Sequence, residues 1–190
     1  MIMAELKDRT RDCHARVEKA VNLSTALRSI DDYARLLVGF HGVYCPLEAS
    51  LAPWMRARGD IVFDERCKRS WLEADLQFLG YDSQTLGDIS RCSRLPRIRS
   101  SAGAWGCLYV LEGSTLGGQV IQRQVAEWYG LTPERGAAFF SGYRDRTAAM
   151  WQQFKLSVTD YSRQHPESTG EIVQAAQETF QAIEGWFHEC

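Results

Sequence analysis

Histidine is scarce in this sequence, and one histidine stands beside a carboxylate. The chain has four histidines. Glu18 follows His14 by four residues, which places both on one face of a helix. A metal-bound imidazole commonly donates its second ring N–H to a carboxylate, which fixes its tautomer and orientation. The spacing is therefore compatible with an oriented metal ligand, although by itself it is more typical of an ordinary ion pair on a helix surface.

The other three histidines offer less for metal binding. His41 lies in the apolar run LLVGFHGVY, where a histidine is usually a hydrogen-bonded interior residue. His165 and His188 fall near expected helix ends, where solvated or capping roles are common. His14 is thus the candidate metal ligand.

Lys7 precedes His14 by seven residues, two turns of a helix or about 10 Å along its axis. A cation at that distance from an iron ion on His14 could reach a carboxylate at the edge of a porphyrin. A solvated basic face of the helix LKDRTRDCHARVEK explains the same charges without any ligand.

A glycine-rich segment interrupts the helical pattern GCLYVLEGSTLGGQVIQRQV at residues 106–125. Gly113, Gly117 and Gly118 lie inside it, with Ser114 and Thr115 between them. Each glycine costs roughly 1 kcal/mol relative to alanine in a helix. Close packing against another helix explains small residues four apart. A wide, flat ligand resting on bare backbone also explains why three glycines and two hydroxyl residues gather here.

Helices must position these residues, because helical periodicity dominates the chain and no alternating strand pattern is found. We expect an all-α fold with about seven or eight helices, in a single compact domain over residues 1–190. The predicted helices cover 4–20, 29–58 after the cap-like SIDD, 64–80 ending at Gly80, 100–129 ending at Gly130, a restart at Thr132–Pro133, 143–164 and 168–188. Residues 81–99 are expected to be rich in turns.

The composition excludes several classes of protein. A net charge of −2 gives no electrostatic basis for binding nucleic acid. No apolar run approaches the roughly 20 residues that span a bilayer, and the six cysteines form no CxxC pair. We expect a cytoplasmic protein with reduced thiols, no nucleic-acid partner and no membrane contact.

Three ordered motifs give this sequence a family resemblance over nearly its whole length. The motifs are LKDRTRDCHARVE, LYVLEGSTLGGQVI and YRDR, and weaker matches are VYCPLE and TFQAI. Together they resemble the heme oxygenase family, and the bacterial biliverdin-producing members most closely.

The resemblance implies a role for each matching residue. His14 corresponds to the proximal heme ligand, with Glu18 beside it. Lys7, Tyr109 and Arg144 correspond to contacts of the heme propionates. The family's glycine-rich distal helix corresponds to Gly113, Gly117 and Gly118, and Phe180 would line the heme pocket.

Two positions depart from the mammalian pattern. Ser114 stands where mammalian members carry an aspartate that holds water near bound dioxygen, and Phe140 stands where they carry a lysine. We expect water held by Ser114, Thr115 or backbone carbonyls to take the place of that aspartate network.

The implied activity is oxidation of heme to biliverdin, carbon monoxide and free iron, with heme as both substrate and cofactor. Dioxygen and an electron donor such as ferredoxin or a reductase would be consumed, and a bilin-accepting protein is a candidate partner. The basic residues of the first helix could dock an acidic donor (Lys7, Arg9, Arg11, Arg16 and Lys19). The alternatives are a non-catalytic heme carrier or sensor on the same fold, and a helical di-iron oxygenase.

Overall fold

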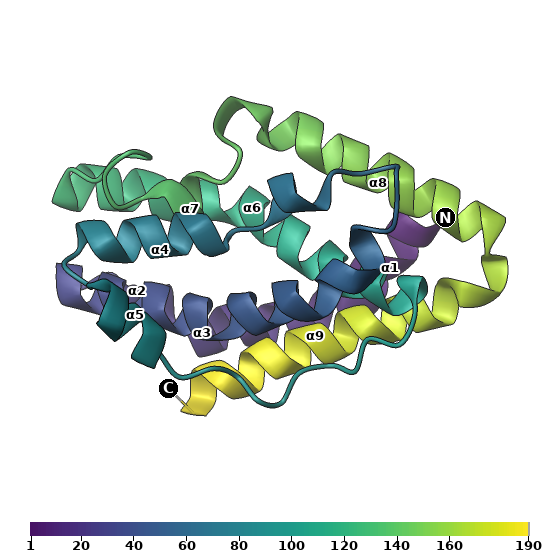
Figure 1. Ribbon diagram of the computed structural model, residues 1–190, viewed down its shortest axis with the longest axis horizontal. Helices are drawn as coiled ribbons and strands as arrows, with labels where there is room; N and C mark the ends of the chain where they lie inside the picture. The colour runs from purple at the N-terminus through teal and green to yellow at the C-terminus, as the bar shows by residue number, and fades with distance from the viewer. Residues whose placement is uncertain (190) are drawn as a thin grey trace.

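The computed structural model describes residues 1–189, and these residues form helices and connecting segments without a β-strand (Figure 1). The α-helices are α1 (Ile2–Val21), α2 (Leu23–Ala26), α3 (Ile30–Met55), α4 (Arg69–Phe78), α5 (Ser83–Asp88), α6 (Ser101–Tyr129), α7 (Ala138–Ser141), α8 (Thr147–Gln164) and α9 (Thr169–Glu189). Three 3₁₀ turns accompany them, η1 (Phe63–Arg66), η2 (Arg144–Arg146) and η3 (Pro166–Ser168). The all-α prediction is confirmed, and α2 and α7 are single turns of four residues each.

The C-terminal helix α9 packs against both α1 and α6 and forms the centre of the layer that positions the site. In Figure 1, α1 and α9 run in the same direction. Gln177 donates to the carbonyl of Arg9 at 2.8 Å, and Arg16 pairs with Glu184 at 3.0 Å. Apolar residues recur at helical spacing along α9 and form one buried face, which packs against the neighbouring helices (Ile172, Val173, Ala176, Phe180 and Ile183).

Four helix boundaries agree with the capping residues in the sequence. The Ser29 and Ser100 hydroxyls accept the N–H groups of Asp32 and Gly103, which begins α3 and α6. Gly130 ends α6 with a left-handed backbone, φ 66°, and Gly80 follows α4 with φ 98°.

The predicted helix over 64–80 begins later than expected. Residues 63–66 form a 3₁₀ turn, and α4 starts at Arg69. The cause is a distant side chain, because the Glu48 carboxylate on α3 accepts the N–H groups of Lys68, at 2.5 Å, and Arg69, at 3.3 Å. A similar delay occurs after Tyr143, where a 3₁₀ turn precedes α8 at Thr147.

The predicted helix restart at Thr132–Pro133 is wrong. Arg135 donates its N–H to the carbonyl of Thr132 at 2.9 Å, so these residues form a turn. Helix α7 begins only at Ala138, where the buried Asp75 carboxylate accepts the N–H groups of Ala138 and Phe139 at 2.7 and 2.8 Å. Burial nevertheless raises the pKa of Asp75 to about 6, against the effect of these two bonds.

Candidate functional site

A cavity of about 780 Å³ lies between α1 and the glycine-rich part of α6. Its volume falls within the range of roughly 300–1,000 Å³ that is usual for small-molecule sites. Aromatic side chains from four further helices close its sides (Phe40, Tyr44, Phe139, Phe140, Trp151 and Phe180). The lining is therefore mainly apolar, and two opposed walls carry the residues that the sequence singled out.

Helix α1 contributes His14 to the first wall. Its side chain is 59 % exposed, and its Nδ1 atom lies 3.6 Å from the Glu18 carboxylate. Because Nδ1 faces this carboxylate, Nε2 is the nitrogen left to bind a metal. The ring of Phe180, on α9, meets the imidazole edge-on at 5.8 Å between centroids, which limits how far the imidazole can turn. The first wall therefore holds one oriented and accessible imidazole.

Helix α6 supplies the opposite wall, and its glycines fall into two kinds. A Cβ atom placed on Gly113 or Gly117 would meet nothing within 4 Å. A Cβ atom on Gly118 would lie 2.8 Å from the carbonyl oxygen of Phe140. Close packing therefore explains Gly118, although it too borders the cavity. Packing does not explain Gly113 and Gly117, which leave bare backbone beside open space.

The hydroxyl protons of Ser114 and Thr115, which lie between these glycines, already form hydrogen bonds within the helix. Ser114 donates to the carbonyl of Leu111 at 2.8 Å, and Thr115 donates to the carbonyl of Glu112 at 2.7 Å. Either oxygen can therefore accept a hydrogen bond from a water molecule but has no proton to give it.

Tyr44 lines the cavity, although no role is predicted for it from the sequence. Its buried hydroxyl donates to Ser114 Oγ at 2.8 Å, and burial raises the pKa of the phenol, so the group stays protonated. Its position within the VYCPLE match was the only signal, because its hydroxyl reaches the site only through the packing of α3 against α6.

The polar edge of the cavity differs from the expectation at one position. Lys7 and Tyr109 line the cavity, and burial raises the pKa of Tyr109. Arg144 does not line it, because this residue has a left-handed backbone, φ 57°, and its guanidinium pairs with Glu134 at 2.7 Å. Two further cations line the cavity, Arg11 and the buried Lys68, and the sequence did not single out either for this role. Arg11 lies one turn after Lys7 and pairs with Asp8 at 2.7 Å.

The residues present fit a heme group. The cavity joins an apolar, aromatic interior to an accessible imidazole on one wall and side-chain-free backbone on the other. Lys7 and Arg11 offer positive charge to carboxylates. A flat, largely apolar ring with a metal centre and acidic substituents matches this arrangement.

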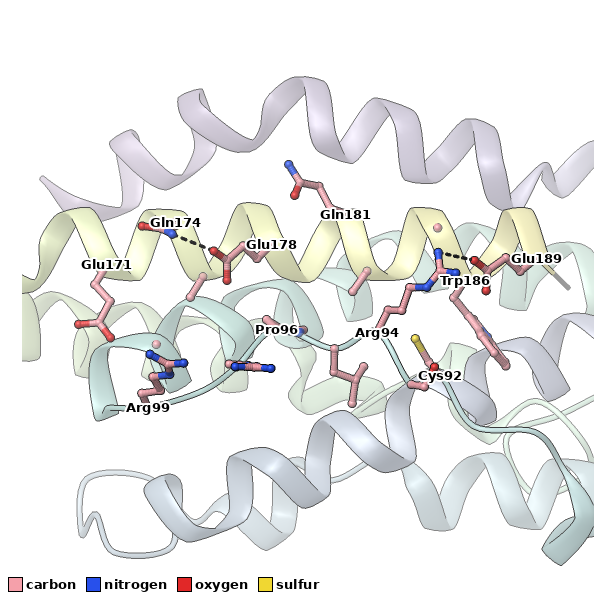
Figure 2. A pocket seen from close by; sticks show the side chains of 17 residues that line it. Cys92, Arg94, Pro96, Arg99, Glu171, Gln174, Glu178, Gln181, Trp186 and Glu189 are labelled. Carbon is pink, nitrogen blue, oxygen red and sulfur yellow. Dashed lines mark hydrogen bonds and ion pairs between the residues drawn. The ribbon is translucent and has the colours of Figure 1, made fainter.

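A second groove, of about 690 Å³, lies between residues 92–99 and α9 (Figure 2). Two pairs of its polar side chains bind each other, since Arg94 pairs with Glu189 at 2.9 Å and Gln174 donates to Glu178 at 2.8 Å. Among the described residues that line it there is no histidine. The groove therefore lacks the imidazole that His14 offers to the cavity between α1 and α6.

The di-iron alternative requires several histidines and carboxylates around two metal ions. Within residues 1–189, no group of three or more His, Cys, Asp or Glu side chains is placed to hold a metal ion. The described part of the chain also has no helix with the length and apolar character needed to cross a membrane.

Comparisons with known proteins point to one family. The heme oxygenase family model matches residues 1–189. A heme oxygenase of Xanthomonas campestris pv. campestris (strain 8004) is 29 % identical over 163 residues, which cover 84 % of this chain and 88 % of that protein.

Two solved structures share the fold. The heme oxygenase of Neisseria meningitidis, solved with bound NO and CO, has a TM-score of 0.78 at 20 % identity and covers 100 % of this chain and 91 % of its own. The heme oxygenase of Leptospira interrogans has a TM-score of 0.72 at 18 % identity, with coverages of 100 % and 99 %. With the family model matched over residues 1–189, this chain belongs to the heme oxygenase family, whose activity is the oxidation of heme to biliverdin.

Proposed function

We propose that this chain binds heme between α1 and α6, with His14 as the iron ligand, and oxidises it to biliverdin, carbon monoxide and free iron. One observation carries the proposal. An accessible imidazole on α1 and the bare backbone at Gly113 and Gly117 border the same cavity. Heme, when bound, supplies the iron at which dioxygen is reduced.

The polar residues of the cavity have distinct tasks in this proposal. Glu18 holds Nδ1 of His14 and so keeps Nε2 directed at the iron. Lys7 and Arg11 bind the propionates, and Tyr109 gives one of them a hydrogen-bond donor. These contacts set how heme is turned about its normal, and so which carbon faces the oxygen site.

On the α6 side, Ser114 and Thr115 hold water by accepting hydrogen bonds from it. Such a water keeps one proton free to point into the cavity, because its other proton is bound by the hydroxyl oxygen. Tyr44 fixes the Ser114 oxygen in place through its 2.8 Å bond. Because both hydroxyl protons are bound to carbonyls of α6, neither side chain can itself donate a proton to a ligand. This favours the second candidate, a heme carrier without an organised proton supply.

We also propose the domain organisation, the partners and the cellular compartment of this activity. The chain forms a single domain over residues 1–190, and an electron donor such as ferredoxin or a reductase docks near the basic residues of α1. A bilin-accepting protein is a further candidate partner. The five free cysteines of the described residues fit the reducing conditions of the cytoplasm.

The test is to add hemin, record the absorption spectrum, and then add ascorbate or a ferredoxin system. Loss of the Soret band with formation of biliverdin supports the oxygenase, whereas an intact Soret band indicates the carrier. His14→Ala should still take up hemin but lose the imidazole-ligated spectrum, and free imidazole should restore it. If His14→Ala keeps the wild-type spectrum and turnover, the assignment of the iron ligand is wrong.

A further inference from the structure

Glu112, the residue directly before Gly113, carries a buried carboxylate that the proposed chemistry does not use. It is 1 % exposed. Lys68 donates to its Oε1 atom at 2.8 Å, Tyr143 donates to the same atom at 2.6 Å, and Arg66 binds its Oε2 atom. These partners reach Glu112 from outside α6, two from residues 63–68 and one from the turn after α7.

The charges of this cluster balance within the protein interior. Arg66 and Lys68 are 2 % and 1 % exposed, so the Glu112 carboxylate alone would leave one buried positive charge uncompensated. Glu48, also buried, is the second carboxylate: it accepts the Lys68 and Arg69 backbone N–H groups and is attracted by the Lys68 charge. Buried charges matched in this way are costly to break, because removal of one partner leaves the other without compensation.

The cluster sits at the start of the segment that leaves open space beside the cavity. Its far end, at Gly118, is held by direct contact with the Phe140 backbone. Between these two ends, Gly113 and Gly117 have no side chain to pack, and the segment has weak helix propensity. The Thr115 hydroxyl adds a link back to Glu112, through the carbonyl oxygen of that residue at 2.7 Å.

We propose that Glu112 is a positioning residue, which fixes the backbone of residues 113–117 over the heme face through Arg66, Lys68 and Tyr143. The proposal rests on the proposed heme site. Residues 113–117 are then held at one end by the charged partners of Glu112 and at the other by the packing of Gly118 against Phe140. Glu112 touches neither heme nor dioxygen in this role and acts only through the backbone that follows it.

The experiment compares Glu112→Gln with Glu127→Gln, an exposed glutamate on the same helix. Amide hydrogen exchange is measured on both heme-free proteins. Glu112→Gln should speed exchange in residues 113–118 by about tenfold or more while exchange in residues 101–107 stays unchanged, and Glu127→Gln should change neither. An equal increase along all of α6, or none, would overturn the proposal.

Two further measurements keep the outcome decisive. Tyr143→Phe removes the hydrogen bond to Glu112 and the one accepted from Lys68 but no charge, so it should produce the same local pattern at smaller size if Glu112→Gln does not fold. In hemin-loaded protein, Glu112→Gln should keep the His14-ligated spectrum but change the dissociation rate of carbon monoxide severalfold. Wild-type protein that shows no His14 ligation contradicts the heme site itself, whereas the exchange pattern tests the positioning role without heme.

Discussion

Helix α6 is one continuous helix, but its two halves differ in what surrounds them. In residues 101–112, almost every side chain is buried, and a Cβ atom on Gly106 would lie 2.1 Å from the Ile172 carbonyl oxygen of α9. In residues 113–129, only four residues are buried, and a Cβ atom on Gly117 would meet nothing within 4 Å. Glycine therefore serves opposite purposes in one helix, close approach at Gly106 and empty space at Gly117.

The largest expected effect tests the packed half. Gly106→Val should cost at least about 3 kcal/mol of the free energy of unfolding or prevent folding, because the Ile172 backbone cannot move aside as a side chain could. Denaturant unfolding of the heme-free protein measures the loss. Gly117→Val is the matched control, and a similar loss in both variants would remove the distinction between the two halves.

Gly118 lies in the open half but should behave like a packed glycine. Gly118→Ala places its Cβ atom 2.8 Å from the Phe140 oxygen, so we expect a loss of about 1–3 kcal/mol in the free energy of unfolding. The comparison is Gly113→Ala, which has open space and should not destabilise the protein. Equal stability of the two variants would show that α7 can move away from α6 at little cost.

At Gly117, stability and ligand binding should change in opposite directions. Gly117→Ala should stabilise the heme-free protein by up to about 1 kcal/mol, because helix propensity rises and nothing obstructs the new methyl group. Gly117→Leu should also fold, but its side chain should fill the space above the heme and weaken carbon monoxide binding at least tenfold. Thermal unfolding and gas titration of the hemin-loaded protein measure the two effects. Destabilisation by Gly117→Ala would show that packing explains this glycine as well.

Sequence spacing could predict the helices and the α1 wall but could not separate these glycines. His14, Glu18 and Lys7 share one helix face, so their proximity follows from local geometry alone. The environments of Gly106 and Gly117 depend on whether α9 or open space faces each one, which spacing within α6 does not reveal.

The remaining differences also come from contacts between distant segments. Arg144 was expected at the cavity because YRDR matches the family, but its left-handed backbone and its pair with Glu134 place it elsewhere. The start of α7 depends on Asp75, more than sixty residues earlier in the chain. Such tertiary contacts override the local pattern that made Thr132–Pro133 resemble a helix start.

His14 and His41 show the same contrast between an open and a packed region of the protein. His14 is accessible at the cavity, whereas His41 on α3 is 0 % exposed. The Arg91 guanidinium lies 2.5 Å from His41 Nδ1 and can only donate, so Nδ1 accepts and Nε2 carries the proton. This contact and the bond from the Cys92 N–H to the Gly42 carbonyl attach residues 91–92 to α3.

A pH titration should therefore detect His41 as a small but specific effect. Burial and the Arg91 charge lower the pKa of His41 below its usual value, and Glu73 opposes them only in part. The unfolded chain then binds a proton near pH 6.5 that the folded protein resists, so stability is lost as the pH falls below about 6.5. Asp75 acts in the opposite direction. Its pKa is about 6 in the folded protein, so stability falls as the pH rises from about 4, the usual pKa of an aspartate, to about 6.

The difference between wild type and His41→Gln isolates the histidine, since Asp75 contributes equally to both proteins. The glutamine amide oxygen can accept from Arg91 at any pH, so the contact with residues 91–92 is kept without a titrating group. Between pH 7 and 5, wild type should lose stability faster than His41→Gln, by no more than about 1.4 kcal/mol per pH unit. Denaturant unfolding at each pH measures the slopes, and His165→Gln, at an exposed histidine, should follow wild type. Parallel curves for wild type and His41→Gln would mean that His41 accepts a proton without losing Arg91, and that the packed region tolerates charge as well as the open cavity does.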